Sequence, residues 1–147
     1  IKRPNLICVD TWEGADEHKD GAMTSSNVLI KVEDTFDKNL NCFKDRVTKY
    51  KGKSSSYYKK NLYVKKFDLV YIDGSHHADD VIIDALNCFE MLCDGGLLIF
   101  DDYLWKYYEK DIDNPAGAIN KFLKIKKKQI KIVCFDYQLA IKKISLI

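Results

Sequence analysis

The sequence of 147 residues predicts a single α/β domain spanning residues 1–147, with a doubly wound, mostly parallel sheet and an antiparallel hairpin at its C-terminal end. Short apolar runs of strand length alternate with segments in which apolar residues recur at helical spacing. This alternation is typical of a parallel sheet with helices on both faces. Two of the apolar runs also end in acidic residues, at the sheet edge where such folds bind ligands.

The N-terminal part of the chain predicts two strands and one helix. Residues 5–12 form an apolar run that indicates a buried strand ending near Asp10, and residues 13–27 have no apolar period and predict a polar loop. Residues 28–43 place apolar side chains on one helical face. Residues 46–50 indicate a short β-branched strand.

The clearest predicted helix covers residues 78–96. Its apolar residues repeat at helical spacing, Asp79 or Asp80 is expected to cap it, and Gly95 and Gly96 are expected to stop it. The sequence therefore predicts that the following strand begins only after the glycine pair.

Four strands and a second helix are expected around that helix. Residues 67–73 and 97–102 predict strands, and the near-absence of alternation in the second indicates that both its faces are covered. Residues 115–127 begin with proline and predict a helix. Residues 130–136 and 137–144 predict an edge hairpin.

Composition argues against several classes of protein. No run approaches the roughly 20 apolar residues of a membrane span, and no signal peptide is visible. The five cysteines are odd in number and lack the C-x-x-C spacing, which favours buried, reduced thiols in a cytoplasmic protein. The formal net charge of +2 predicts no nucleic-acid partner.

The charged residues are unevenly distributed. Residues 49–66 and 121–131 contain seven and six lysines and no acid, whereas twelve acids lie between residues 68 and 113. We interpret the lysine runs as solvated surface and the acidic centre as consistent with a cation site.

Three carboxylates follow two predicted strands. The stretch "FDLVYIDGSHHADD" delivers Asp73 to one strand end, and "GGLLIFDDYLW" delivers Asp101 and Asp102 to the next. Because clustered carboxylates repel unless a cation compensates them, we predict that these three bind a divalent ion such as Mg²⁺. The alternative is that Asp101 only ends its strand and Asp102 faces solvent.

Two histidines follow Asp73 closely. A neutral imidazole at His76 can reach over the same site and accept a proton from a substrate hydroxyl, or can merely order the loop. His77 and His18 are expected to face solvent, and Gly74 to permit a sharp turn. Asp10, at the end of the first strand, can accept both hydroxyls of a ribose.

Other motifs are missing from the chain. No G-x-x-x-x-G-K-[ST] phosphate loop is present, and Ser75 does not lie in a G-x-S-x-G elbow, which argues against a serine hydrolase.

The segment "FDLVYIDGSHHADDVIIDAL…LCDGGLLIFDDYLW" resembles the class I S-adenosylmethionine-dependent methyltransferases, in particular the small-molecule and sugar O-methyltransferase branch. The resemblance also covers "VDTWEG" and "DYQLAIKK", and so nearly the whole chain. It implies a Rossmann-like fold, a small-molecule acceptor, and the cofactors S-adenosylmethionine and Mg²⁺ or another divalent cation.

The resemblance also implies residue roles. Asp10 would hold the cosubstrate ribose, with Asp73 and Gly74 lining the cosubstrate site. Asp73, Asp101 and Asp102 would bind the metal, and His76 would be the general base.

One part of the family pattern is missing. Members carry a first strand, a Gly-rich turn and a helix before "VDTW", where this sequence has only "IKRPN" and begins with Ile1. We therefore expect an N-terminally incomplete domain in which the two flanking strands pair directly, or another chain or upstream residues fill the gap, with a homo-oligomer or partner chain as one possibility.

Two alternatives to an active enzyme stay open at this point. One is a catalytically inactive relative that serves as a binding or assembly module. The other is a receiver-like phosphate-handling domain, whose acids would have to occur in the reverse order along the chain.

Overall fold

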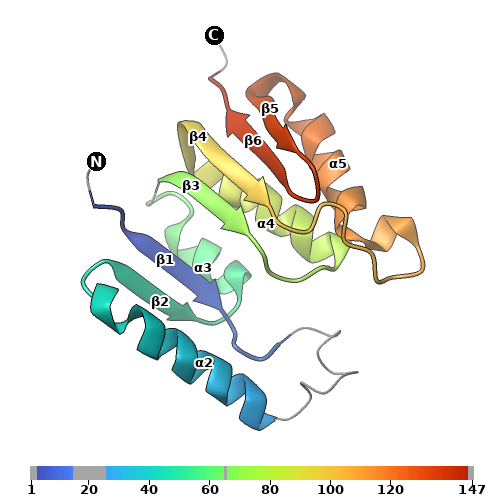
Figure 1. The fold of residues 1–147 in the computed structure, drawn as a ribbon. Helices are drawn as coiled ribbons and strands as arrows, with labels where there is room; N and C mark the ends of the chain where they lie inside the picture. Colours follow the sequence, from blue (N-terminus) through green and yellow to red (C-terminus); the bar gives the residue numbers. More distant parts are fainter. Residues whose placement is uncertain (1–2, 15–25, 65, 146–147) are drawn as a thin grey trace. The chain divides into compact units, whose positions relative to one another are not determined.

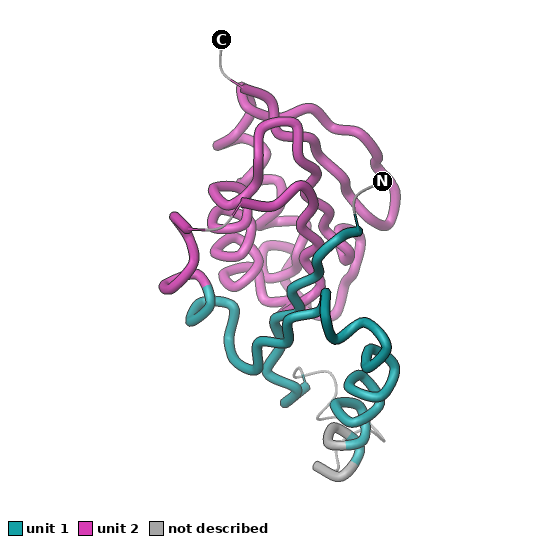
Figure 2. The backbone as a smooth tube through the Cα atoms, turned by 90° about the vertical axis from the view of Figure 1, so that its left-hand side faces the viewer, with its two compact units in different colours: residues 1–57 teal, residues 58–147 magenta. Residues whose placement is uncertain are grey.

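The computed structural model describes residues 3–14, 26–64 and 66–145, which form α/β structure throughout (Figure 1). The chain divides into two compact units, unit 1 (Ile1–Tyr57) and unit 2 (Tyr58–Ile147), coloured separately in Figure 2. Each unit contains its own sheet. The prediction of a single domain over residues 1–147 stays a prediction.

Unit 1 is built on two parallel strands, β1 (Leu6–Asp10) and β2 (Val47–Lys51). The connection between them contains α2 (Ser26–Leu40) and a short 3-10 turn, Asn41–Phe43. A crossover helix of this kind is what parallel neighbours require. The boundary with unit 2 falls within α3 (Ser54–Asn61).

Unit 2 contains a four-stranded sheet in the order β3-β4-β6-β5. β3 and β4 are parallel, while β6 is antiparallel to both β4 and β5. The predicted α/β class with parallel strands and a C-terminal antiparallel hairpin is therefore confirmed. The elements of this unit are β3 (Phe67–Ile72), α4 (Ala78–Met91), β4 (Leu92–Phe100), α5 (Pro115–Ile125), β5 (Ile130–Phe135) and β6 (Leu139–Lys143), with 3-10 turns at Asp111–Asp113 and Lys127–Gln129.

The core of unit 2 lies between the sheet and two helices, α4 and α5, which cover the same face (Figure 1). Phe122 of α5 meets Phe89 of α4 and Phe100 of β4 edge to face, with centroid separations of 5.6 Å in both pairs. Leu139 and Ile141 of β6 complete this layer and are fully buried. Burying rings of this size is the main stabilising contribution that such a unit has.

The opposite face of this sheet is less covered. On β4, Leu98 and Phe100 are buried, whereas Leu97 and Ile99 are half-buried. Leu97 pairs in register with Leu69 on β3, whose side chain is 53% exposed. Burial along β4 thus alternates within unit 2, and the expectation that both faces of this strand are covered stays a prediction.

The end of α4 differs from its prediction. The helix begins after His77 without a side-chain cap, so neither aspartate of its first turn acts as the cap. It ends at Met91 rather than at the glycine pair, because Leu92 already adopts extended backbone and starts β4. Lys143 of β6 donates to the carbonyls of Phe89 and Leu92, at 2.9 Å each, and so satisfies this helix end.

The glycine pair instead forms an irregularity within β4. The register with β3 shifts between its pairs at Phe67 and Leu69. Gly95 has φ +81°, a conformation that strains other residues, and a Cβ on Gly96 would come within 2.8 Å of the Leu92 side chain. Both glycines therefore serve an irregularity within β4, and they do not end α4 as predicted.

Three further expectations concern strands, thiols and membranes. Hydrogen bonding joins β1 to β2 in unit 1 and β3 to β4 in unit 2, and the direct pairing of β1 with β3 stays a prediction. Of the free cysteines, Cys88 is buried but Cys42 and Cys134 are exposed, because they lie in a short turn and an edge strand. No helix in the described ranges has the length and apolar character to cross a bilayer.

Candidate active site

The site forms where β3 and β4 end side by side. Ile72 and Phe100 are paired in register, and the Asp101 amide donates to the Ile72 carbonyl at 3.0 Å. Because the two strands are parallel, the residues that follow them leave the sheet at the same edge. This brings the "DGSHH" turn next to the two acids after β4.

Three side chains gather at this edge: Asp73, His76 and Asp102. One ligand atom from each lies within 4.8 Å of the other two, which is a spacing that a metal ion can bridge. His76 Nε2 is 2.9 Å from Asp102 Oδ2, and both side chains are 15% exposed. Asp73 is exposed, so the cluster opens to solvent on the side of that carboxylate.

Asp101 has different partners from its neighbour. Its Oδ1 accepts hydrogen bonds from Tyr71 Oη and Gln138 Nε2, and Gln138 Nε2 is also 3.0 Å from Tyr71 Oη. The hydrogen bond to Asp101 raises the pKa of Tyr71 to about 12. Asp101 is not part of the cluster around His76, and its predicted role as a metal ligand stays a prediction.

The His76 ring is held on several sides. Trp105 lies against it with ring centroids 4.3 Å apart, and Nδ1 is buried while Nε2 faces Asp102. The nitrogen that can exchange a proton with a ligand is therefore Nε2. This geometry is compatible with both interpretations of His76, as a general base and as a residue that orders the loop.

His77 does not face solvent, contrary to prediction. Its ring stacks on Tyr108 at 4.6 Å, and its Nε2 is 3.0 Å from the Tyr108 hydroxyl. His18 lies outside the described residues. The aromatic contribution of residues 103–108 was missed, although "YLWKYY" directly after Asp102 is an aromatic cluster that could have signalled it.

Gly74 was expected to be required by a sharp turn. Its φ is not in the left-handed region, and an added Cβ would meet only the Asp84 carboxylate at an ordinary 3.7 Å. Local backbone geometry therefore does not demand glycine there. Its predicted place beside a cosubstrate stays a prediction.

Asp10 lies in unit 1, directly after β1. Its Oδ1 accepts the Trp12 amide N–H at 2.6 Å, in a turn where Trp12 has φ 55°. A non-glycine residue in this region is uncommon and stores strain. The Trp12 ring turns onto Phe36, at 5.2 Å, and under the Lys49 ammonium, at 4.6 Å, while Asp10 itself remains exposed.

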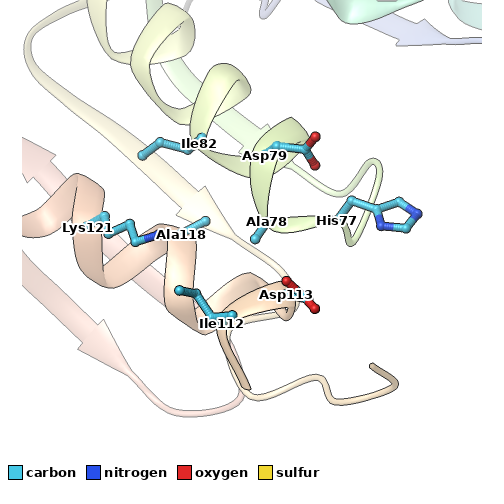
Figure 3. A pocket seen from close by; sticks show the side chains of 8 residues that line it. All are labelled: His77, Ala78, Asp79, Ile82, Ile112, Asp113, Ala118 and Lys121. Atoms are coloured by element: carbon cyan, nitrogen blue, oxygen red, sulfur yellow. The ribbon is translucent and has the colours of Figure 1, made fainter. Parts of the chain in front are cut away.

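Unit 2 contains two cavities near these residues. A small one, of about 10 Å³, lies at the strand ends against His76 and Asp102. An open one, of about 530 Å³, lies between the N-terminal ends of α4 and α5, and Figure 3 shows the side chains that line it. Its lining residues include Asp79, Asp113 and Lys121, and Asp73, His76 and Asp102 are not among them.

Residues 2–103 match the model of the methyltransferase domain family. The match covers well over half of the chain, so the chain belongs to the methyltransferase domain family. The predicted family is thereby confirmed, which disfavours the receiver-like alternative. Comparison with curated proteins gave no match.

Solved structures of O-methyltransferases share the fold. The O-methyltransferase NovP is 15% identical, with a TM-score of 0.66 over 99% of this chain and 62% of its own. MycE from the mycinamycin biosynthetic pathway, in complex with Mg, SAH and mycinamycin VI, is 14% identical, with a TM-score of 0.60 over 97% of this chain and 45% of its own. The O-methyltransferase from Bacillus cereus in complex with SAH is 15% identical, with a TM-score of 0.56 over 95% of this chain and 74% of its own.

The matched share of this chain is larger than the matched share of each solved structure. Nearly all of this chain is matched, but it spans only 62% of the length of NovP. The likeness at these identities concerns the fold.

Proposed function

We propose that this chain forms part of an S-adenosylmethionine-dependent methyltransferase that methylates a hydroxyl oxygen of a small molecule or sugar with the help of a divalent cation. The observation that carries the proposal is the cluster of Asp73, His76 and Asp102 at adjacent strand ends, within a chain of the methyltransferase family. Support also comes from MycE, which shares the fold and whose solved structure contains Mg and SAH.

The donor set fits a hard divalent ion. Mg²⁺ and Mn²⁺ prefer carboxylate oxygens, and Mn²⁺ also accepts an imidazole nitrogen. Asp73 and Asp102 would supply the carboxylates. Asp101 would be the third ligand through Oδ2, since both of its described hydrogen bonds use Oδ1.

When bound, the cation would lower the pKa of a substrate hydroxyl, and S-adenosylmethionine would supply an electrophilic methyl group. His76 would accept the hydroxyl proton at Nε2, since Nδ1 is buried. In the contact with ionised Asp102, Nε2 carries the ring proton, so the base role requires that Asp102 turn toward the cation and that the ring proton move to Nδ1, which leaves the lone pair on Nε2. Trp105 would hold the imidazole plane while that exchange occurs.

The cosubstrate roles are proposed for each unit by itself. Asp10 would accept the ribose hydroxyls through its carboxylate, because it follows β1 and is exposed. Asp73 and Gly74 would line the cosubstrate site in unit 2.

Thermal unfolding with added Mg²⁺ or Mn²⁺ tests the metal proposal. A ligand that binds the folded state raises the melting temperature by mass action. We expect a rise that Asp73→Asn, Asp102→Asn and Asp101→Asn each remove, while Asp68→Asn, at the other end of β3, retains it. No rise in the unmodified chain would count against a cation site in this chain.

The same titration decides whether the third metal ligand is Asp101 or His76. If the rise survives in Asp101→Asn and is lost in His76→Ala, the third ligand is the imidazole and its role as a base is wrong. Loss in Asp101→Asn alone supports the carboxylate set.

Calorimetric titration of S-adenosylhomocysteine tests the cosubstrate proposal. We expect binding to an N-terminally extended chain that is abolished or strongly weakened by Asp10→Ala. Metal binding without any nucleoside binding in the extended chain would favour the alternative, an inactive relative that serves as a binding or assembly module.

A further inference from the structure

Asn114 is a buried polar residue that the proposed chemistry does not use. It precedes α5 at the N-cap position, and it is 2% exposed. Asparagine is a favoured cap because its side-chain oxygen accepts an amide N–H of the first helical turn. Here the side chain makes no such bond to its own helix.

The Asn114 amide is used on another segment instead. Oδ1 accepts the backbone N–H groups of Tyr107 and Tyr108, at 3.0 and 3.1 Å, and Nδ2 donates to the carbonyls of Tyr108 and Lys110, at 2.9 and 3.0 Å. Both donors and both acceptor positions of the amide are thereby satisfied. One buried side chain thus binds four backbone groups of residues 107–110.

This segment lacks regular secondary structure that would fix its course. Residues 105–110 form neither helix nor strand. Backbone groups that do not belong to a helix or sheet need other partners when they are shielded from water. The partners that hold this stretch are supplied in large part by Asn114.

The same segment carries the rings that contact both histidines. Trp105 lies 4.3 Å from the His76 ring, and Tyr108 stacks on His77 at 4.6 Å with its hydroxyl 3.0 Å from Nε2. Trp105 also contacts the rings of Tyr107 and Tyr108, at 5.6 and 5.8 Å. A displacement of residues 107–110 would therefore be transmitted to the imidazole of His76.

We propose that Asn114 is a positioning residue, which fixes the 105–110 segment so that Trp105 holds the His76 ring and Tyr108 holds the His77 ring. The four described hydrogen bonds of the Asn114 side chain all go to backbone groups, and Asn114 acts on the imidazoles through that backbone. The consequence for methyl transfer rests on the proposed function, because His76 is the base only there. The geometric part of the proposal does not depend on it.

The test measures the ring-proton chemical shifts of His76 by NMR at constant pH, in the absence of metal and cosubstrate. An aromatic ring at this distance displaces these shifts, so Trp105→Leu defines the Trp105-dependent displacement. We expect Asn114→Ser to lose most of that displacement, although serine is itself a good helix cap and should let α5 begin normally. Asn87→Ser, which removes an asparagine from α4, should leave the displacement unchanged.

A His76 spectrum that stays at its original position in a folded Asn114→Ser variant would overturn the proposal. Amide hydrogen exchange in the unmodified chain gives a second measurement that needs no variant. We expect the Tyr107 and Tyr108 amides to be protected by about tenfold or more over an unstructured chain. Exchange of both at unstructured rates would equally overturn the proposal, whether or not the chain methylates any acceptor.

Discussion

In unit 2 the rings of Phe89, Phe100 and Phe122 meet edge to face, and none is more than 1% exposed. In unit 1 the rings of Trp12 and Phe36 are half-buried beneath the Lys49 ammonium, and of a second ring pair, Tyr50 and Tyr57, only Tyr57 is buried. Lys49 in turn pairs with Glu33 and Asp37, at 2.7 and 2.8 Å, and all described residues of β1 and β2 are half-buried or exposed.

This difference in burial implies that the two units are stabilised by different kinds of interaction. A dry aromatic core contributes several kcal/mol for each large ring, whereas exposed ion pairs contribute about 0 to 1 kcal/mol each in general. Unit 2 therefore provides a buried frame for the cluster of Asp73, His76 and Asp102, for which we propose a role in chemistry. Unit 1 presents Asp10, for which we propose a role in binding, from a less buried frame.

The largest expected effect comes from the core of unit 2. Phe122→Ala removes a fully buried ring that contacts two others, and we expect it to lower the free energy of unfolding by about 3–5 kcal/mol. The matched control is Phe135→Ala on the edge strand, whose ring is 63% exposed and which should cost much less. Urea denaturation followed by circular dichroism measures both, and equal losses would contradict the contrast between core and edge.

The second prediction separates the two units by function in an N-terminally extended enzyme. His76→Ala should lower turnover by ~10²-fold or more with cosubstrate affinity nearly unchanged, because only a proton transfer is lost. Asp10→Ala should instead weaken S-adenosylhomocysteine binding by roughly tenfold or more, the value of a charged hydrogen bond. Steady-state kinetics and calorimetry distinguish these outcomes, and a His76→Ala enzyme with full turnover would reduce His76 to a loop residue.

A smaller effect is expected from the ion pairs of unit 1. Hydrogen bonds from Lys49 and Lys51 lower the pKa of Glu33, so their contribution to stability is present at neutral pH and is lost as the pH falls through that lowered pKa. Lys49→Met should destabilise slightly at low salt and not at high salt. Lys38→Met on α2, the helix that carries Glu33, is the control. A loss at Lys49 that does not depend on salt would point to packing of its stem on Trp12 instead.

The smallest effect concerns Tyr71 and distinguishes the two neighbouring acids. Its pKa is raised to about 12 by Asp101, from an ordinary value of about 10. The neutral phenol is favoured in the folded state, so the contribution to stability is present below pH ~10 and is lost as the pH rises toward 12. Because burial also raises the pKa of Tyr58 and of Tyr137, the Tyr71 titration is isolated as the ultraviolet difference between the unmodified chain and Tyr71→Phe. Asp101→Asn should shift this late titration to lower pH by more than Asp102→Asn does.

The sequence alone determined which residues reach the strand ends. Apolar runs of strand length and helical periodicity are local properties, so they predicted β3, α4, β4 and the hairpin to within a few residues, apart from the end of α4. The same local order predicted that Asp73 and the pair after Phe100 share one edge of the sheet. It also predicted the methyltransferase family, because the residues of the two motifs are close in sequence.

Only the tertiary structure decided what each of those residues contacts. Asp101 and Asp102 are neighbours in sequence, yet one meets Gln138, from 37 positions away, and the other meets His76, from 26 positions away. The end of α4 depends on a lysine of β6, 51 positions beyond Leu92, and the role of Asn114 depends on a loop with no regular structure. Such partners are brought together by packing of distant segments, whereas a local pattern carries information only about a residue's own turn or strand.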